Sequence, residues 1–325
     1  TMIDLSTEYA GLKLRNPLIA ASSGLTNSIK KIKELEKAGV GAVVLKSLFE
    51  EQIDSHSEKL NLSSDYPEAS DYINAYVEMN HVEKYLDLIR EAKASCNIPI
   101  IASINCYKVD RWIDFAKSIE SAGADALELN IFLINTGQYG DRYLEESYIK
   151  IVREVKKVIN IPIIIKIART VSNLPGLVEK LEALGVSAVV LFNRFYQLDI
   201  DINKMEIISG PVFSHPEDFS ETLRWTAITS GYVQNFDIAC SYGVHKHEDI
   251  IKGLLAGATA MQLCSVLYEE GLNIIPEMIT YMEEWMKQNN YKTLQDFRGK
   301  LSYSNIPDPA LYERAQFMKY FANHK

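Results

Sequence analysis

The sequence predicts an α/β barrel built from eight strand–helix units, and two internal repeats are the main support. A motif of a small residue or leucine, then glycine, then an apolar run ending in leucine occurs at 38–45, 122–129, 184–191 and 256–263. Each copy follows an amphipathic stretch, so the glycine is expected to end a helix and the apolar run to form a strand. A second repeat opens strands with proline and continues with uninterrupted apolar residues, as in NIPIIASI (97–104) and NIPIIIKI (160–167). Such strands are typical of a parallel sheet buried on both faces.

Eight strands can be located along the chain, with helical patterns between most of them. They are expected near 17–22, 41–47, 98–104, 125–131, 161–167, 187–193, 236–241 and 259–265. Eight such units form a TIM (β/α)8 barrel. The alternative, a doubly wound open sheet, would carry a glycine-rich fingerprint after its first strand, and IAASSGLTNS lacks GxGxxG. The whole chain, 1–325, is expected to form one domain.

Composition and charge exclude several classes of protein. Hydrophobic residues make up 47% of the 325 residues, which is enough for a large buried core. The 34 Lys and Arg residues against 43 Asp and Glu residues give a net charge of −9, which disfavours nucleic acid and anionic membranes as partners. The first residues lack a signal-peptide pattern, and no stretch is apolar over the length of a bilayer. A soluble, cytoplasmic protein is therefore expected.

The spacing of cysteine and histidine does not indicate a metal centre. The four cysteines are scattered without CxxC spacing, so they are expected to be reduced thiols, mostly in the core. His245 and His247 stand beside a predicted helix start and are expected to form a solvated cap rather than a metal pair. No metal site is predicted.

Two segments fit neither the strands nor the helices of the barrel. They are 48–75, rich in Ser, Asp and Glu, and 194–216. Long insertions of this kind usually cover an active site. In a TIM barrel the reactive groups stand at the carboxyl ends of the strands, so both insertions are expected over that face.

Polar side chains stand at the carboxyl ends of the predicted strands. They are Ser22, Ser23, Lys46, Ser47, Asn105, Asn130, Lys166, Asn193, Ser241, Cys264 and Ser265. Serine and asparagine are common where a strand leaves the core. A lysine brought toward the barrel mouth is costly to bury without a partner. Lys46 and Lys166 therefore indicate an anionic ligand or an electron-rich ring.

The last two strand–helix units add a candidate phosphate site. Gly243 follows the seventh strand and Cys264–Ser265 follows the eighth, which brings backbone N–H groups to the place where TIM barrels commonly bind phosphate. Loops of this type often hold two glycines. Tyr242 occupies the other place in this chain.

Over nearly its whole length the chain resembles the dihydroorotate dehydrogenases, which are FMN-dependent TIM-barrel enzymes of pyrimidine synthesis. The pattern is similar to that of the soluble, class 1-like members. The resemblance is carried by GLKLRNPLIAASSG (11–24), GAVVLKS (41–47), INAYVEMNHVEKYLD (73–87), SGPVFSHPEDFSETLRW (209–225) and AGATAMQLCSVLYEEG (256–271).

The resemblance implies a set of ligand-binding residues. Those around FMN would be Ala21, Ser22, Lys46, Ser47, Asn130, Lys166, Gly210, Gly243, Cys264 and Ser265. Those around an orotate-like ring would be Lys46, Asn74, Asn130, Asn135 and Asn193. A fixed ammonium stabilises the negative charge of reduced flavin, and asparagine amides match the alternating N–H and C=O groups of a pyrimidine. A small pyrimidine-like substrate is the expected partner, and a homodimer is a possible assembly.

The chain departs from the family at the catalytic base. The family reads Asn-Leu-Ser-Cys-Pro-Asn after its fourth strand, or has Ser in place of Cys, and that Cys or Ser removes the C5 proton. In ELNIFLIN (128–135) the base position falls on Leu133 and the proline position on Ile134. Leucine cannot accept a proton, and the loss of a positioned base costs roughly 10²–10⁴ in rate. Cys106, Tyr139 and His215 are weak substitutes.

Three functions are consistent with the sequence. The first is an FMN-dependent oxidoreductase that oxidises dihydroorotate or a related dihydropyrimidine-like ring. The second is a flavin-binding protein that keeps an orotate-like pocket and serves as a sensor or partner without dihydroorotate turnover. The third is a flavin-free barrel enzyme that acts on a phosphorylated metabolite through a Schiff base at Lys46 or Lys166.

Overall fold

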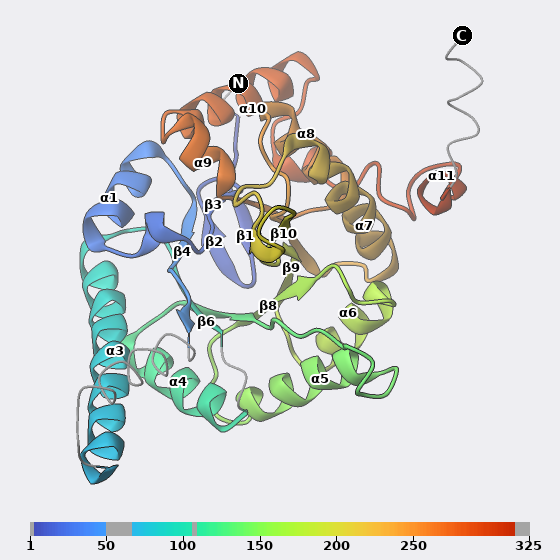
Figure 1. Cartoon of the computed structure of the whole chain (residues 1–325). Helices are drawn as coiled ribbons and strands as arrows, with labels where there is room; N and C mark the ends of the chain where they lie inside the picture. The colour runs from blue at the N-terminus through green and yellow to red at the C-terminus, as the bar shows by residue number, and fades with distance from the viewer. Residues whose placement is uncertain (1–2, 50–66, 106–108, 316–325) are drawn as a thin grey trace.

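The computed structural model of the chain describes residues 3–49, 67–105 and 109–315. Eight parallel strands close into a barrel, seen end-on in Figure 1. In ring order they are β3 (Leu18–Ala20), β4 (Ala42–Val44), β6 (Ile100–Asn105), β7 (Ala126–Asn130), β8 (Ile163–Ala168), β9 (Ala188–Asn193), β12 (Asp237–Cys240) and β13 (Ala260–Leu263). Each strand overlaps the range predicted for it, so the predicted TIM barrel is confirmed.

Helices surround the barrel on its outside (Figure 1). They are α1 (Ile29–Ala38), α3 (Pro67–Ser95), α4 (Val109–Ala122), α5 (Tyr143–Lys156), α6 (Leu174–Ala183), α7 (Phe219–Tyr232), α8 (His247–Ala256), α9 (Ser265–Glu270) and α10 (Ile274–Gln288). The short helix α11 (Ala310–Glu313) lies outside this ring, beyond α7. Outward side chains of the strands, such as Val43, Leu127 and Val189, belong to the main apolar core with the inner faces of these helices. In the described part of the chain, no helix is both long enough and apolar enough to cross a membrane.

The repeated glycine does end helices, as predicted. The copies in the four repeats, Gly39, Gly123, Gly185 and Gly257, all have positive φ, between 87° and 116°. At Gly39 the backbone N–H donates to the carbonyls of Leu35 and Glu36 and closes α1. A left-handed residue is compatible with glycine and strained for other residues, which explains why the motif recurs.

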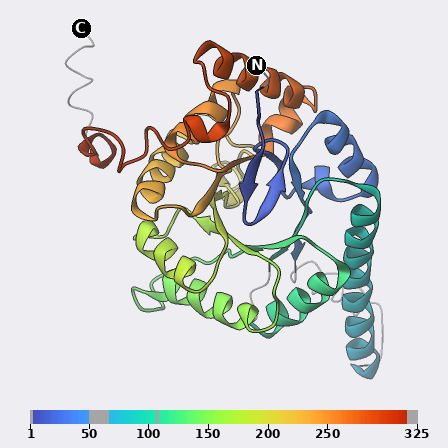
Figure 2. The same ribbon diagram turned by 180° about the vertical axis from the view of Figure 1, so that it is seen from behind.

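The amino-terminal end of the barrel is closed by a hairpin of β1 (Thr7–Tyr9) and β2 (Leu12–Leu14), which lies in front of the barrel in Figure 2. Tyr9 and Leu14 are fully buried there and form a second apolar cluster with inward side chains of the strands, many of them alanine. Small side chains on the strands leave room for the tyrosine ring. The hairpin therefore forms the floor of the barrel.

The two insertions contain more regular structure than the sequence indicated. Segment 194–216 forms an antiparallel hairpin of β10 (Leu198–Asp201) and β11 (Glu206–Ser209), which lies over the opposite end of the barrel from β1–β2 (Figures 1 and 2). Segment 48–75 begins with β5 (Leu48–Phe49), and its last residues belong to α3. Residues 50–66 are outside the described part of the chain.

A polar layer lies inside the barrel. Glu128 of β7 is fully buried, and its Oε2 accepts a hydrogen bond from Nε2 of Gln262 (β13) at 2.7 Å. Oε1 of the same glutamine accepts a hydrogen bond from Nζ of Lys166 (β8) at 3.0 Å, and Lys166 is 9% exposed. One amide thus joins a buried carboxyl to a buried ammonium.

The environment of Glu128 favours its neutral form. Burial raises the pKa of Glu128 above its ordinary value, while the charge of Lys166 and the hydrogen bond from Gln262 lower this pKa by smaller amounts. Its second oxygen, Oε1, is buried without a hydrogen-bond partner, and so is the hydroxyl of Tyr9. The carboxyl is therefore held inside the barrel at a cost in free energy that depends on pH.

We expect Glu128→Gln to change how stability depends on pH. Because the folded-state pKa of Glu128 is raised, the folded chain retains a proton that the unfolded chain releases. Wild-type stability should therefore fall as the pH rises from about 4.5 through the folded-state pKa, with a slope of up to about 1.4 kcal/mol per pH unit. Glutamine does not titrate, so the variant should lose this contribution to the slope.

Urea unfolding of the two proteins across this pH range measures the difference. Glu182→Gln, at an exposed position of α6, is the matched control and should keep the wild-type slope. Parallel stability profiles for wild type and Glu128→Gln would mean that Glu128 titrates alike in the folded and unfolded chains.

Candidate functional site

A cavity of about 570 Å³ opens at the carboxyl ends of the barrel strands, beneath the β10–β11 insertion. It is lined by residues from several strand ends and from the insertion. The predicted residues among its lining are Ala21, Ser22, Ser47, Asn130, Lys166, Asn193, Gly210, Cys264 and Ser265. The structure therefore brings most of the predicted ligand-binding residues to one cavity.

Asn130 presents an acceptor to this cavity. Its Nδ2 donates to the hydroxyls of Ser47 at 2.7 Å and Ser103 at 2.9 Å, and Ser47 also contacts the hydroxyl of Ser22 at 3.1 Å. Both amide hydrogens are thus engaged, while the buried Oδ1 has no hydrogen-bond partner. A buried amide oxygen in this state favours a ligand that donates an N–H or O–H.

Lys166 and Asn193 are fixed beside it. Asn193 is 4% exposed, and its Nδ2 donates to the backbone carbonyl of Lys166 at 3.0 Å. The ammonium of Lys166 is oriented by Gln262, as described above, and burial in the same region raises the pKa of the Cys264 thiol. The cavity centre therefore combines a fixed cation with a neutral thiol and amides.

Several predicted residues lie elsewhere. Lys46 and Asn135 do not line the cavity, and Asn135 instead bonds within its own loop, to the Gly140 carbonyl at 3.1 Å and the Gly137 N–H at 3.0 Å. Asn74 lies on α3, not in a loop, and its side chain is outside the described part. The contribution of these residues to ligand binding stays a prediction.

Gly243, predicted to contact phosphate, has a packing role in this structure. Its φ is +83°, and a Cβ added there would lie 2.3 Å from the backbone nitrogen of Phe219. The glycine lets the loop after β12 approach the start of α7. Its neighbours Tyr242 and Val244 line the cavity in its place.

None of the three substitute bases lines the cavity as a described side chain. Tyr139 is 52% exposed and stacks on Tyr143, with ring centroids 4.0 Å apart. His215 is exposed, and its backbone N–H donates to Asp218 at 2.8 Å. Cys106 lies outside the described residues.

Leu133, where the resemblance places the family's base, is apolar and turned to the core. Leu133 is half-buried and packs against the main apolar core, whereas its neighbour Phe132 lines the cavity beside Phe195, with ring centroids 5.6 Å apart. The carbonyl of Ile131 accepts a hydrogen bond from Tyr148, which fixes the segment as it leaves β7. The side chains of this stretch cannot accept a proton.

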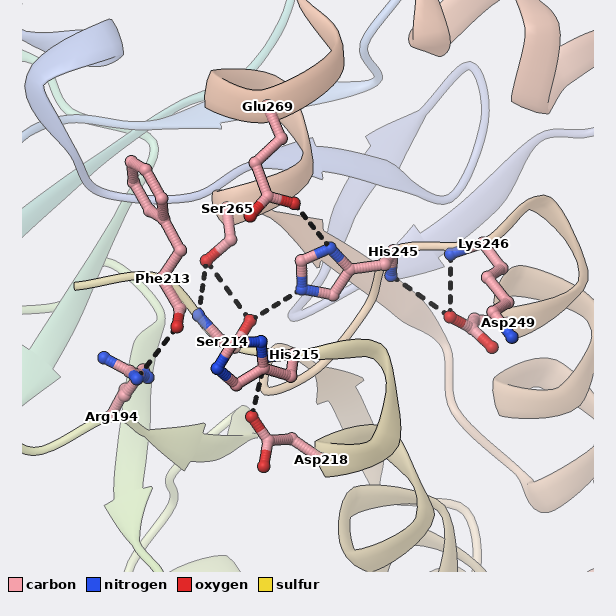
Figure 3. Close-up of polar contacts among 10 residues, drawn as sticks. All are labelled: Arg194, Phe213, Ser214, His215, Asp218, His245, Lys246, Asp249, Ser265 and Glu269. Carbon is pink, nitrogen blue, oxygen red and sulfur yellow. Dashed lines mark hydrogen bonds and ion pairs between the residues drawn. The ribbon is translucent and has the colours of Figure 1, made fainter. Parts of the chain in front are cut away.

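The insertion is held over the cavity by Arg194, a residue that the sequence did not single out. Figure 3 shows its guanidinium at the loop that precedes η2 (Pro216–Asp218). It donates to the carbonyls of Pro211 at 3.0 Å, Val212 at 2.6 Å and Phe213 at 2.9 Å. The only sequence signal was that this segment is an insertion at the barrel mouth.

A second feature missed in the sequence is the group of Ser214, Ser265 and His245 (Figure 3). Both serines line the cavity, and His245 lies behind them with 9% exposure, so the predicted solvated cap is wrong for this residue. The helix cap is provided instead by Asp249, whose Oδ2 accepts the backbone N–H groups of His245 and Lys246. Because Asp249 makes these cap bonds, the imidazole of His245 can contact Ser214 at the cavity wall.

The described residues contain no group of three or more His, Cys, Asp or Glu side chains that could hold a metal ion. Burial raises the pKa of the Cys240 thiol to about 12, so this cysteine behaves as a core residue. The described side chains that line the cavity offer amides, hydroxyls, a thiol, one ammonium, one guanidinium and aromatic surface.

Comparison with known proteins agrees with this picture. The family model for dihydroorotate dehydrogenase matches residues 4–286. The catalytic subunit of dihydroorotate dehydrogenase B (NAD(+)) from Thermoplasma acidophilum is 28% identical over 307 residues, which are 92% of this chain and 99% of the relative. Relatives of the same name from Methanocaldococcus jannaschii (91% of this chain, 97% of the relative) and Petrotoga mobilis (92% and 99%) are each 25% identical.

The family match spans all eight barrel strands and the cavity above them. Members of this family are generally FMN-dependent oxidoreductases that act on CH–CH groups. The chain belongs to the dihydroorotate dehydrogenase family and is an oxidoreductase of that type.

Proposed function

We propose that this chain uses FMN to oxidise the CH–CH bond of a dihydropyrimidine-like ring. The proposal rests on Lys166 and Asn130, which both line the centre of the cavity. A buried ammonium and an amide oxygen without a partner both line the same space. A flat, electron-rich ring would interact with the ammonium of Lys166, and the N–H group of a ligand beside it would donate to the amide oxygen of Asn130.

The other walls of the cavity fit FMN as well. Its volume of about 570 Å³ lies within the roughly 300–1,000 Å³ typical of cofactor sites. Phe192, Phe195 and Tyr196 offer apolar surface for a ring system, and the hydroxyls of Ser214 and Ser265 offer polar contacts for a phosphate. The ammonium, the aromatic side chains and the hydroxyl groups together offer the contacts that a flavin mononucleotide needs.

FMN would supply the ring that accepts the hydride. The chain would supply the electrostatic environment, because the ammonium of Lys166 stabilises negative charge that develops on a ring beside it. Gln262 limits the motion of that ammonium through its 3.0 Å contact. Asn130 and Asn193 would orient the substrate ring through neutral amide groups.

The segment 131–134 supports a second candidate, a protein that binds flavin and a pyrimidine-like ligand with little turnover. Leu133 packs on the core and Phe132 lines the cavity, so neither can take a proton from the substrate. Loss of a positioned base lowers the rate by roughly 10²–10⁴. The two candidates share their ligands and differ in the rate of oxidation.

We expect the purified chain to contain FMN and not FAD. Ser214 and Ser265 line the cavity and form one candidate phosphate site, and the sequence has no dinucleotide fingerprint. Mass spectrometry of the cofactor released by heat or acid identifies it. Released FAD, or failure of the colourless protein to bind added FMN, would contradict the proposal; the second result would favour the flavin-free hypothesis with Lys166 as a Schiff-base lysine.

We also expect orotate to perturb the flavin spectrum while dihydroorotate reduces the flavin slowly. Asn193→Ala should weaken orotate binding about tenfold, because the ligand loses a buried amide partner. Anaerobic titration with orotate and stopped-flow reduction by dihydroorotate measure the two effects.

Asn97→Ala is the matched control for this experiment, since Asn97 is exposed just before β6 at the other end of the barrel. It should leave orotate binding unchanged. Fast reduction by dihydroorotate would require a proton acceptor outside segment 131–134. No spectral response to orotate would mean that the asparagines bind a different ligand.

A further inference from the structure

A hydrogen-bonded chain of four side chains borders the cavity at its α9 side (Figure 3). Glu269 Oε2 lies 3.3 Å from His245 Nδ1, and Nε2 of the same imidazole lies 2.9 Å from the hydroxyl of Ser214. That hydroxyl lies 3.2 Å from the hydroxyl of Ser265. The chain therefore runs from a half-exposed carboxylate, through a buried imidazole, to two hydroxyls at the cavity wall.

The protonation state of His245 decides which way these hydroxyls point. With a neutral imidazole, Nδ1–H donates to Glu269, so Nε2 must accept the hydrogen of Ser214, and Ser214 cannot also donate to Ser265. With an imidazolium, Nε2–H donates to Ser214 and Ser214 donates to Ser265, which is the direction that the 3.2 Å contact has in the structure. The hydrogen of Ser265 is then free to point into the cavity. Only the second state offers the cavity both a positive charge and an O–H donor.

We propose that His245, Ser214 and Ser265 form a proton-linked receptor for a phosphomonoester, in which anion binding and proton uptake by His245 occur together. This inference rests on the proposed function, because it assigns the phosphate end of the bound mononucleotide to this group. The proton enters from solvent and stays on the imidazole, between the carboxylate of Glu269 and the hydroxyl of Ser214. No bond other than these hydrogen bonds is made or broken.

The same arrangement of serine, histidine and glutamate occurs in hydrolases, but the surroundings of Ser214 favour an anion receptor. A nucleophilic serine needs free N–H donors that stabilise the developing oxyanion. The N–H of Ser214 donates to Ser265 Oγ at 3.1 Å, and the next N–H, of His215, donates to Asp218 at 2.8 Å. Both nearby backbone donors are therefore already used.

Charged groups of α8 and α9 lie around His245. Glu269 of α9 lies 3.3 Å from its Nδ1, and Asp249 of α8 accepts its backbone N–H at 3.1 Å and lies 3.8 Å from Lys252. Other titratable groups close in sequence or around the same loops are Tyr242, Lys246, His247, Glu248, Tyr268, Glu270, Arg194, His215 and Asp218. A phosphate dianion at the two serines would add the strongest negative charge beside them.

Calorimetric titration with FMN and with riboflavin tests the proposal, because the two ligands share the ring and differ in the phosphate. At pH near 8 a phosphomonoester is already a dianion and an imidazole in water is neutral. Repeating each titration in buffers of different ionisation enthalpy gives the number of protons taken up. We expect FMN binding to take up close to one proton more than riboflavin binding.

His245→Gln should abolish the extra proton uptake and lower FMN affinity about tenfold or more, as expected for the loss of a charge-assisted interaction, with riboflavin affinity unchanged. His247→Gln is the matched control. His247 is two residues away and more exposed, with its Nε2 3.5 Å from Glu277, and its replacement should leave both ligands as in wild type.

The outcomes separate this inference from the proposed function. FMN that binds with the same proton uptake as riboflavin would overturn the proton-linked receptor and leave FMN binding intact, and the wild-type measurement alone decides this. Loss of riboflavin affinity in His245→Gln would assign His245 a structural role and contradict the proposal. Failure of both ligands to bind the wild-type chain would overturn the proposed function together with this inference.

Discussion

The hydrogen-bonded chain from Glu128 through Gln262 to Lys166 is the constraint on which the rest of the site depends. Burying an ammonium and a carboxyl inside a barrel is unfavourable unless both are hydrogen-bonded. The glutamine amide meets this need by accepting from the ammonium and donating to the carboxyl. Because the three residues stand on β7, β8 and β13, their contact also fixes where the strand ends that form the cavity floor lie relative to one another.

Around this centre the cavity has two chemically different ends. The end at Asn130 and Asn193 offers neutral amides and the ammonium, which suits flat rings with imide groups. The end at Ser214 and Ser265 offers hydroxyls whose orientation depends on the imidazole behind them. Arg194 joins the two functions, because its guanidinium holds the insertion that brings Ser214 to the cavity. The apolar segment 131–134 thus lies beside a cavity whose other walls offer polar contacts to a ligand.

The barrel could be predicted from the sequence because its signals are local and repeated. The four repeated glycines mark the ends of four helices, and uninterrupted apolar runs mark the strands, without knowledge of the partner strands. Most cavity residues followed from their positions at strand ends. The contact of Ser214 with His245 joins residues 31 apart, and that of Gln262 with Glu128 joins residues 134 apart, so neither could be read from spacing. The direction of Leu133 depends on packing after β7, which periodicity does not reveal.

We propose that Lys166 places a fixed positive charge beside the flavin ring. The decisive measurement is the reduction potential of the flavin in wild type, in Lys166→Met and in Lys180→Met, where Lys180 is an exposed lysine near the end of α6. We expect Lys166→Met to lower the potential by tens of millivolts, where about 30 mV corresponds to 1.4 kcal/mol for two electrons, and Lys180→Met to leave it unchanged. An equal potential in wild type and Lys166→Met would mean that the ammonium of Lys166 does not act on the flavin.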